Sequence, residues 1–146
     1  MNVKYLLTTL IIFCFFTINA QNFSKEFGKV GRDEIELTQY GKDKSAEAVV
    51  LFDIGMSSFY QNEGAFEINF ERKTRIKILS EAGLKWAEIE IPFYQEGGIY
   101  EKISNIEAYT YNFEEGLLQK TKFDPTNCHE ERLYVYWLVK KFVLPN

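Results

Sequence analysis

The chain has 146 residues and a net charge of −4, and 46% of its residues are hydrophobic. An acidic chain does not offer the basic surface with which proteins bind nucleic acids or anionic membranes. Its length is sufficient for a single domain with a hydrophobic core.

Residues 1–20 have the pattern of a secretory signal peptide. Lys4 supplies a positive charge, residues 5–18 are almost wholly apolar, and the small residue Ala20 directly precedes Gln21. This order predicts cleavage between Ala20 and Gln21. An uncleaved anchor is the alternative, but the apolar run is shorter than the roughly 20 residues of a membrane-spanning helix. We expect a periplasmic or secreted domain, residues 21–146, with no membrane attachment after cleavage.

Removal of the signal peptide leaves a single cysteine, Cys128, because Cys14 lies in the apolar run. An internal disulfide is then impossible, so the hydrophobic core must stabilise the fold.

The first half of the predicted domain contains the clearest strand pattern. Residues 32–37 predict one or two helical turns, and Asp43 to Glu47 have the pattern of a capped short helix. Residues 48–52 predict a buried strand that ends at 53–55. Residues 66–78 alternate between apolar and polar, which indicates a long antiparallel strand with one solvent-facing side. Arg72 breaks the apolar side and predicts a bulge or a sheet edge there.

The second half predicts further strands separated by turns. We expect a turn at 80–83, a strand at 87–91 that Pro92 ends, and a loop at 95–98. Residues 103–113 and 117–123 predict two strands joined by a hairpin turn at 114–116. A turn at 124–127, a short helix or loop at 130–137 and a last strand at 140–144 follow. The predicted fold is mainly β: an incomplete antiparallel, sandwich-like arrangement with one or two short helices.

The sequence contains no recognisable catalytic pattern. Cys128 and His129 are adjacent, and neighbouring side chains on an extended segment point in opposite directions. The paired acids at 114–115 and at 130–131 are interpreted as solvated side chains. Nucleotide-binding glycine motifs are missing from the sequence. We therefore predict no catalytic, cofactor-binding or metal-binding residues and no enzymatic activity for this chain.

Two tyrosines are candidates for binding sugar rings. Tyr109 and Tyr111 lie on one side of a predicted strand, where exposed rings would stack on a glycan. The alternative, which we favour, is that both rings pack in the core or in cross-strand pairs.

Six blocks of sequence resemble a known bacterial domain when they are taken in order: Ala46 to Asp53, Phe70 to Leu79, Trp86 to Pro92, Ile103 to Asn112, Tyr136 with Trp137, and Lys141 to Asn146. Together they resemble the N-terminal domain of unknown function that precedes transglutaminase-like domains in exported proteins of Gram-negative bacteria. The resemblance implies that residues 21–146 are about the first half of that domain. Its missing partners would be the downstream strands and the transglutaminase-like domain, whose cysteine nucleophile is not Cys128.

These observations lead to a functional hypothesis with two alternatives. The leading hypothesis is an exported, non-catalytic accessory or binding module of a transglutaminase-like (protease-like) protein, with an envelope polypeptide or glycan as a further partner. A stand-alone binding protein for a cell-envelope glycan is the first alternative, and a gene remnant that yields no stable product is the second.

Overall fold

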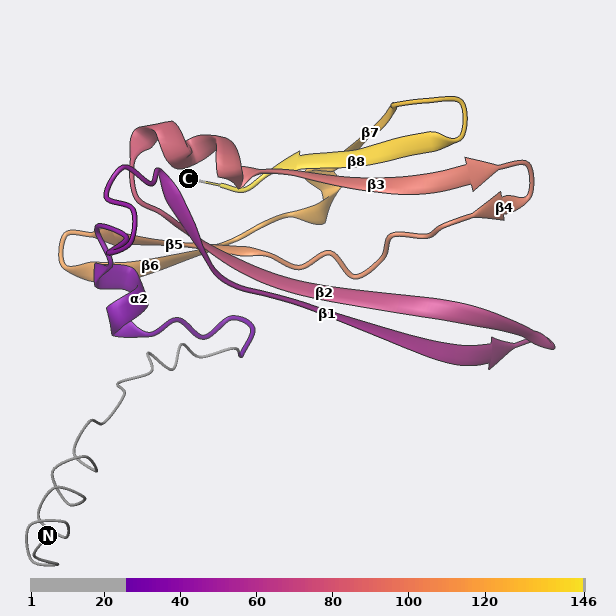
Figure 1. Cartoon of the computed structure of the whole chain (residues 1–146), viewed down its shortest axis with the longest axis horizontal. Coiled ribbons are helices and arrows are strands. Elements are labelled where there is room, and N and C mark those ends of the chain that lie inside the picture. The colour runs from indigo at the N-terminus through magenta and orange to yellow at the C-terminus, as the bar shows by residue number, and fades with distance from the viewer. Residues whose placement is uncertain (1–25, 146) are drawn as a thin grey trace, which may run out of the picture.

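The computed structural model describes residues 26–145, most of which form antiparallel strands, as predicted (Figure 1). One hairpin consists of β1 (Ala48–Asn62) and β2 (Ala65–Ile78), and a second consists of β5 (Tyr109–Glu114) and β6 (Leu117–Lys122). A four-stranded sheet has the order β4-β3-β8-β7. Its strands are β3 (Glu88–Glu96), β4 (Ile99–Tyr100), β7 (His129–Arg132) and β8 (Trp137–Val143).

The arrangement is sandwich-like, with the four-stranded sheet on one side and the two hairpins on the other (Figure 1). The core is small and consists of Phe52, Phe93, Phe123, Val139 and Phe142. Phe123 follows β6 and stacks on Phe142 of β8 at a centroid distance of 4.7 Å. This stack joins the β5–β6 hairpin to the four-stranded sheet.

Helical structure in residues 26–145 is short. It comprises α2 (Arg32–Glu36) and the 3₁₀ helices η1 (Glu81–Ala87) and η2 (Pro125–Asn127). The prediction of a helix at 32–37 is confirmed, whereas the capped helix at 43–47 is wrong. Asp43 accepts hydrogen bonds from the amide and hydroxyl of Ser45, but β1 begins at Ala48, so the segment forms only a turn. No helix in the described part of the chain is long and apolar enough to cross a membrane.

The β1–β2 hairpin is longer than the sequence predicted. The long strand at 66–78 is confirmed, but β1 does not end at 53–55 and instead pairs with β2 as far as Asn62. Glu63 and Gly64 form the connecting turn with φ values of 49° and 89°, the conformation that two-residue hairpin loops prefer. The bulge lies between Val50 and Phe52, and Arg72 remains in register, so a bulge at Arg72 is wrong. The alternative, a sheet edge, is confirmed, because β2 is one of only two strands in this sheet of the described residues.

Pro92 does not end β3, contrary to the prediction. The amide of Gln95 donates to the carbonyl of Tyr136, so alternation directs the backbone of odd-numbered β3 residues toward β8. The nitrogen of Pro92 therefore points to the opposite edge. There, β4 pairs only with Gln95 and Glu96, so the proline removes no hydrogen bond from the sheet.

The segment 130–137 contains the end of β7 and a loop at 133–136 rather than a short helix. β7 pairs with β8, which begins three residues earlier than predicted. Charged residues on both strands interrupt the apolar–polar alternation by which strands are recognised in a sequence. The strands still form because these charges are paired between them: Lys140 contacts Glu130 at 3.1 Å and Lys141 contacts Glu131 at 3.0 Å. The hairpin turn at 114–116 is confirmed, whereas residues 103–108 lie outside any strand.

Candidate binding surface

The distal half of the β1–β2 hairpin presents four large hydrophobic side chains to solvent. The register places Phe59 opposite Ile68, and alternation places Phe66 and Phe70 on the same side of the hairpin. Their exposed fractions are 72% for Phe59, 66% for Ile68, 78% for Phe66 and 63% for Phe70. We call these four residues the hairpin apolar face.

The local sequence explains how this face forms. On β2, Phe66, Ile68 and Phe70 alternate with Glu67, Asn69 and Glu71, so this strand has one apolar and one polar side. On the second side of the hairpin, β1 adds the exposed side chains of Ile54, Met56 and Tyr60. Gly55 lies on β1 beneath the Phe70 ring, where an added Cβ would come within 2.9 Å of the ring. The glycine therefore allows Phe70 to lie close against β1.

An ion pair marks the inner limit of the hairpin apolar face. The Arg72 guanidinium donates to both carboxylate oxygens of Asp53, at 2.8 and 2.6 Å. These hydrogen bonds hold the pKa of Asp53 below its usual value. Both side chains are accessible to solvent. Along the hairpin, this pair lies between the exposed apolar face and the inner half.

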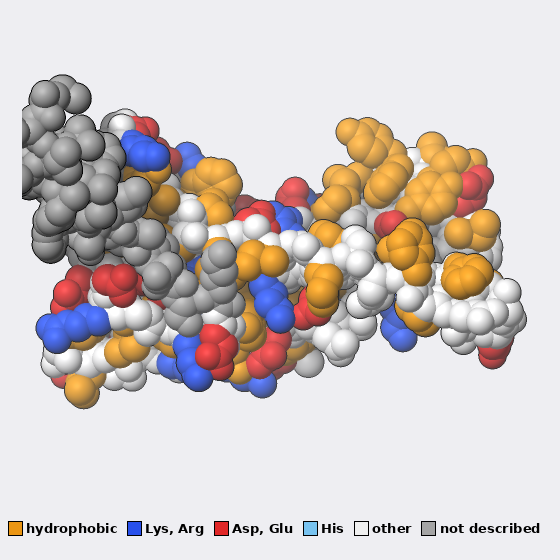
Figure 2. Space-filling view, turned by 60° about the horizontal axis from the view of Figure 1, so that its bottom comes forward, with side chains coloured by type: hydrophobic (Ala, Val, Ile, Leu, Met, Phe, Trp, Pro, Cys, Tyr) orange, Lys and Arg blue, Asp and Glu red, His pale blue; other side chains and the backbone are white. Residues whose placement is uncertain are grey.

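Further hydrophobic residues are exposed at the same end of the molecule, where Figure 2 shows hydrophobic side chains gathered. Tyr134 and Val135 lie between β7 and β8 and are 73% and 71% exposed, and Ile99 of β4 is 72% exposed. Isolated exposed hydrophobic residues are ordinary, but contiguous groups of them mark interaction sites.

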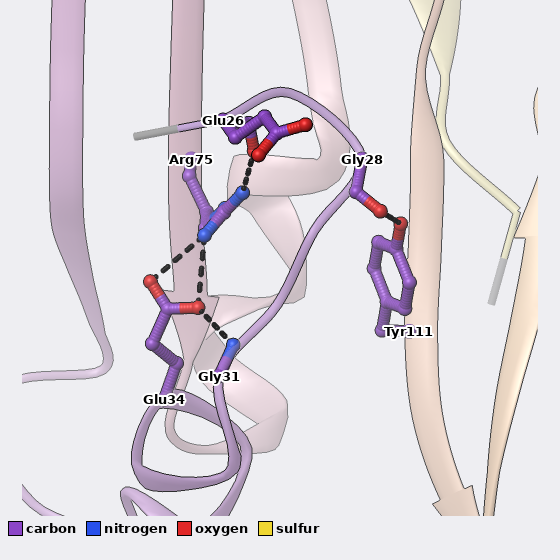
Figure 3. Close-up of polar contacts among 6 residues, drawn as sticks. All are labelled: Glu26, Gly28, Gly31, Glu34, Arg75 and Tyr111. Atoms are coloured by element: carbon purple, nitrogen blue, oxygen red, sulfur yellow. Dashed lines mark hydrogen bonds and ion pairs between the residues drawn. The ribbon is translucent and has the colours of Figure 1, made fainter. Parts of the chain in front are cut away.

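The inner half of the hairpin is fixed by a buried ion pair (Figure 3). Nη1 of Arg75 on β2 lies 2.8 Å from both carboxylate oxygens of Glu34, whose side chain is 1% exposed. The amide of Gly31 donates to the same carboxylate at 2.7 Å. The Arg75 guanidinium also lies over the ring of Phe52, 4.8 Å from its centroid. Helix α2 is thereby locked to the hairpin.

The segment before α2 is held to both hairpins (Figure 3). Arg75 donates to the carbonyl of Glu26 at 2.8 Å, and the Tyr111 hydroxyl donates to the carbonyl of Gly28 at 2.7 Å. Residues 26–36 therefore connect β2 to β5, and the distal hairpin projects from a fixed base.

Tyr109 and Tyr111, the candidate glycan-stacking residues, are occupied by contacts within the chain. The ammonium of Lys120 lies 3.8 Å from the centroid of Tyr109 and 5.6 Å from that of Tyr111. The Phe27 ring is 5.8 Å from Tyr109, whose hydroxyl donates to Glu107. That hydrogen bond raises the pKa of Tyr109. These contacts favour the packing role over glycan stacking.

The remaining residues considered in the sequence are dispersed. Cys128 is a free, half-buried thiol, and the imidazole of the exposed His129 lies 3.6 Å from Glu131. Glu130 and Glu131 contact different lysines, and residues 26–145 contain no cluster of three or more potential metal ligands. The predicted cleavage site at Ala20 and Gln21 lies outside the described residues.

The exposure of the hairpin apolar face could not be predicted from the sequence. The alternation at 66–78 was recognised, but its apolar side was expected to face the core. The missing signal was the extent of β1, because a strand that reaches Asn62 leaves the hairpin too long to be covered by residues 26–145.

No protein-family model, curated protein or solved structure matches the chain.

Proposed function

We propose that the chain is an exported, non-catalytic accessory module of a transglutaminase-like, protease-like protein, and that it binds polypeptide through the hairpin apolar face. The observation that carries this proposal is the exposure of Phe59, Phe66, Ile68 and Phe70 on one side of a fixed hairpin. Burying one such side chain contributes about 1.5–3 kcal/mol, so these four residues can supply most of the energy of a specific contact.

Polypeptide suits this face better than glycan does. The four side chains contain no hydrogen-bonding atom, and Ser57 and Gln61 are the polar residues that β1 places beside them. A sugar presents many hydroxyls that need partners when they are buried. The apolar side of another strand or sheet packs face to face on such a surface at about 10 Å. The contacts around Tyr109 and Tyr111 point the same way, because both half-buried rings already contact Lys120 and Tyr109 also contacts Phe27.

Site-specific photocrosslinking in cells that express the protein tests the proposal. A photoreactive residue replaces Ile68 on the apolar face, and the matched control replaces its neighbour Asn69 on the polar side of β2. We expect Ile68 to crosslink to polypeptide that mass spectrometry assigns to a transglutaminase-like protein, and Asn69 to give little product. Equal labelling at both positions, no product at Ile68, or a product that is glycan would contradict the proposal.

A further inference from the structure

The outer edge of β1 is unpaired among the described residues. β1 hydrogen-bonds with β2 on one side, and no other strand of residues 26–145 joins this sheet. Figure 1 shows β1 on the side of the hairpin that faces away from the four-stranded sheet. A row of backbone donors and acceptors therefore faces outward along β1.

The turn identifies the residues whose backbone groups face outward. Asn62 and Ala65 flank the two-residue turn and form the hydrogen-bonded pair that closes such loops. Because the direction of backbone groups alternates along a strand, the outward-facing residues of distal β1 are Gly55, Ser57, Phe59 and Gln61.

This edge lacks the usual protection against pairing. Ile54–Asn62 contains no charged residue and no proline, and the bulge in β1 precedes it. Natural edge strands are normally blocked by charges, prolines or bulges. β2 is protected in this way, since its distal half carries Glu67, Glu71, Arg72 and Lys73.

We propose that a second copy of this chain adds to the outer edge of β1, so that two hairpins form one four-stranded antiparallel sheet. The uncharged run Ile54–Asn62 is centred on Ser58, which places the two-fold axis at that residue. Met56 of each copy then faces Tyr60 of the other, and Ser57 faces Phe59. Such a contact is isologous, as in most homodimers.

The uncharged run suits a second copy as the occupant. Each chain carries a net charge of −4, so two copies can meet only along a strip where no acidic residue faces another, and Ile54–Asn62 paired with itself is such a strip. Pairing also removes a weakness of the fold, because two-stranded hairpins are marginally stable and a wider sheet is more stable. The dimer uses the strand edge and leaves the hairpin apolar face open, so it is independent of the proposed function.

Analytical ultracentrifugation of the full chain tests the dimer. We expect the wild type to sediment at twice its denatured mass at micromolar concentration. Ser58→Lys places two ammonium groups opposite each other at the axis and should give monomer. Asn69→Lys is the matched control, because Asn69 pairs with Ser58 inside the hairpin but lies on β2; it should remain dimeric. A monomeric wild type, or equal dimerisation of the two variants, would overturn the proposal.

A disulfide provides a second readout that does not depend on weakening the contact. In the proposed dimer, Ser58 of one copy faces Ser58 of the other at a non-hydrogen-bonded position, where the two Cβ atoms approach closely enough for a disulfide. In a background of Cys14→Ser and Cys128→Ser, we expect Ser58→Cys to form a covalent dimer on mild oxidation. Asn69→Cys should not. Crosslinking of Asn69→Cys to the same extent would count against the predicted register.

Discussion

Removing one member of the buried Glu34–Arg75 pair should destabilise the protein strongly. The Glu34 side chain is 1% exposed and Arg75 is 12% exposed, so Glu34→Ala leaves a guanidinium that water cannot reach freely. Breaking a buried pair in this way costs about 3–5 kcal/mol. The carboxylate also accepts the amide of Gly31, which loses its partner in the same variant. Against a typical domain stability of about 5–15 kcal/mol, this is a large loss.

The chain supplies a matched comparison for this prediction. Arg72 lies three residues from Arg75 on β2 and makes a similar two-point contact with Asp53, but its side chain is 60% exposed. Arg72→Ala should cost far less than Glu34→Ala, because water screens the exposed pair. Replacing both buried partners, with Glu34→Leu and Arg75→Met, should restore much of the stability that Glu34→Ala loses.

Urea unfolding followed by tryptophan fluorescence measures these differences, and the slope of the transition shows whether unfolding remains two-state. A cost below about 1 kcal/mol for Glu34→Ala, or a cost no greater than that of Arg72→Ala, would show that the buried pair does not stabilise the fold in this way.

Three further predictions concern backbone packing, the core and acid stability. Gly83→Ala should destabilise by about 1–3 kcal/mol in urea titrations, because its Cβ would lie 2.2 Å from a backbone carbonyl oxygen, whereas Gly41→Ala meets no atom within 4 Å and should cost far less. Phe142→Ala should cost about 3–5 kcal/mol at a position that is 4% exposed, and Phe66→Ala, at 78% exposed, should change the unfolding midpoint little. The pKa of Asp53 is lowered in the folded state, so its ionised carboxylate stabilises the fold above about pH 4, and this stabilisation is lost as the pH falls through the folded pKa. Asp53→Asn should therefore make the free energy of unfolding less dependent on pH in acid.

The sequence predicted the fold where one physical rule governed a segment. The alternation at 66–78 gave β2, and the turn at 114–116 gave the β5–β6 hairpin because Gly116 readily adopts the left-handed φ that a two-residue turn requires. The predictions failed where the pairing of strands, rather than the local sequence, determined the structure. Pro92 is tolerated because its nitrogen faces a free edge, and β7 forms because its charges are neutralised across β8. Neither condition is visible before the strand order is known.

The candidate site depended even more on tertiary structure. The sequence marked Tyr109 and Tyr111 as aromatic but could not show that Lys120 lies over both rings and that Phe27 contacts Tyr109. Phe66, Ile68 and Phe70 had the pattern of core residues, and only the packing shows that they are exposed. Periodicity identifies the apolar side of a strand, but it does not show whether that side is covered.

If polypeptide covers the hairpin apolar face in the cell, a cysteine introduced on that face should be shielded from reagents there. Ile68→Cys and Asn69→Cys, each in a Cys128→Ser background, are treated with a maleimide reagent in intact cells and after purification. Both positions are exposed in this structure, so both should react in the purified protein. We predict that position 68 is protected in cells while position 69 reacts freely. Full reaction at position 68 in cells would contradict the claim.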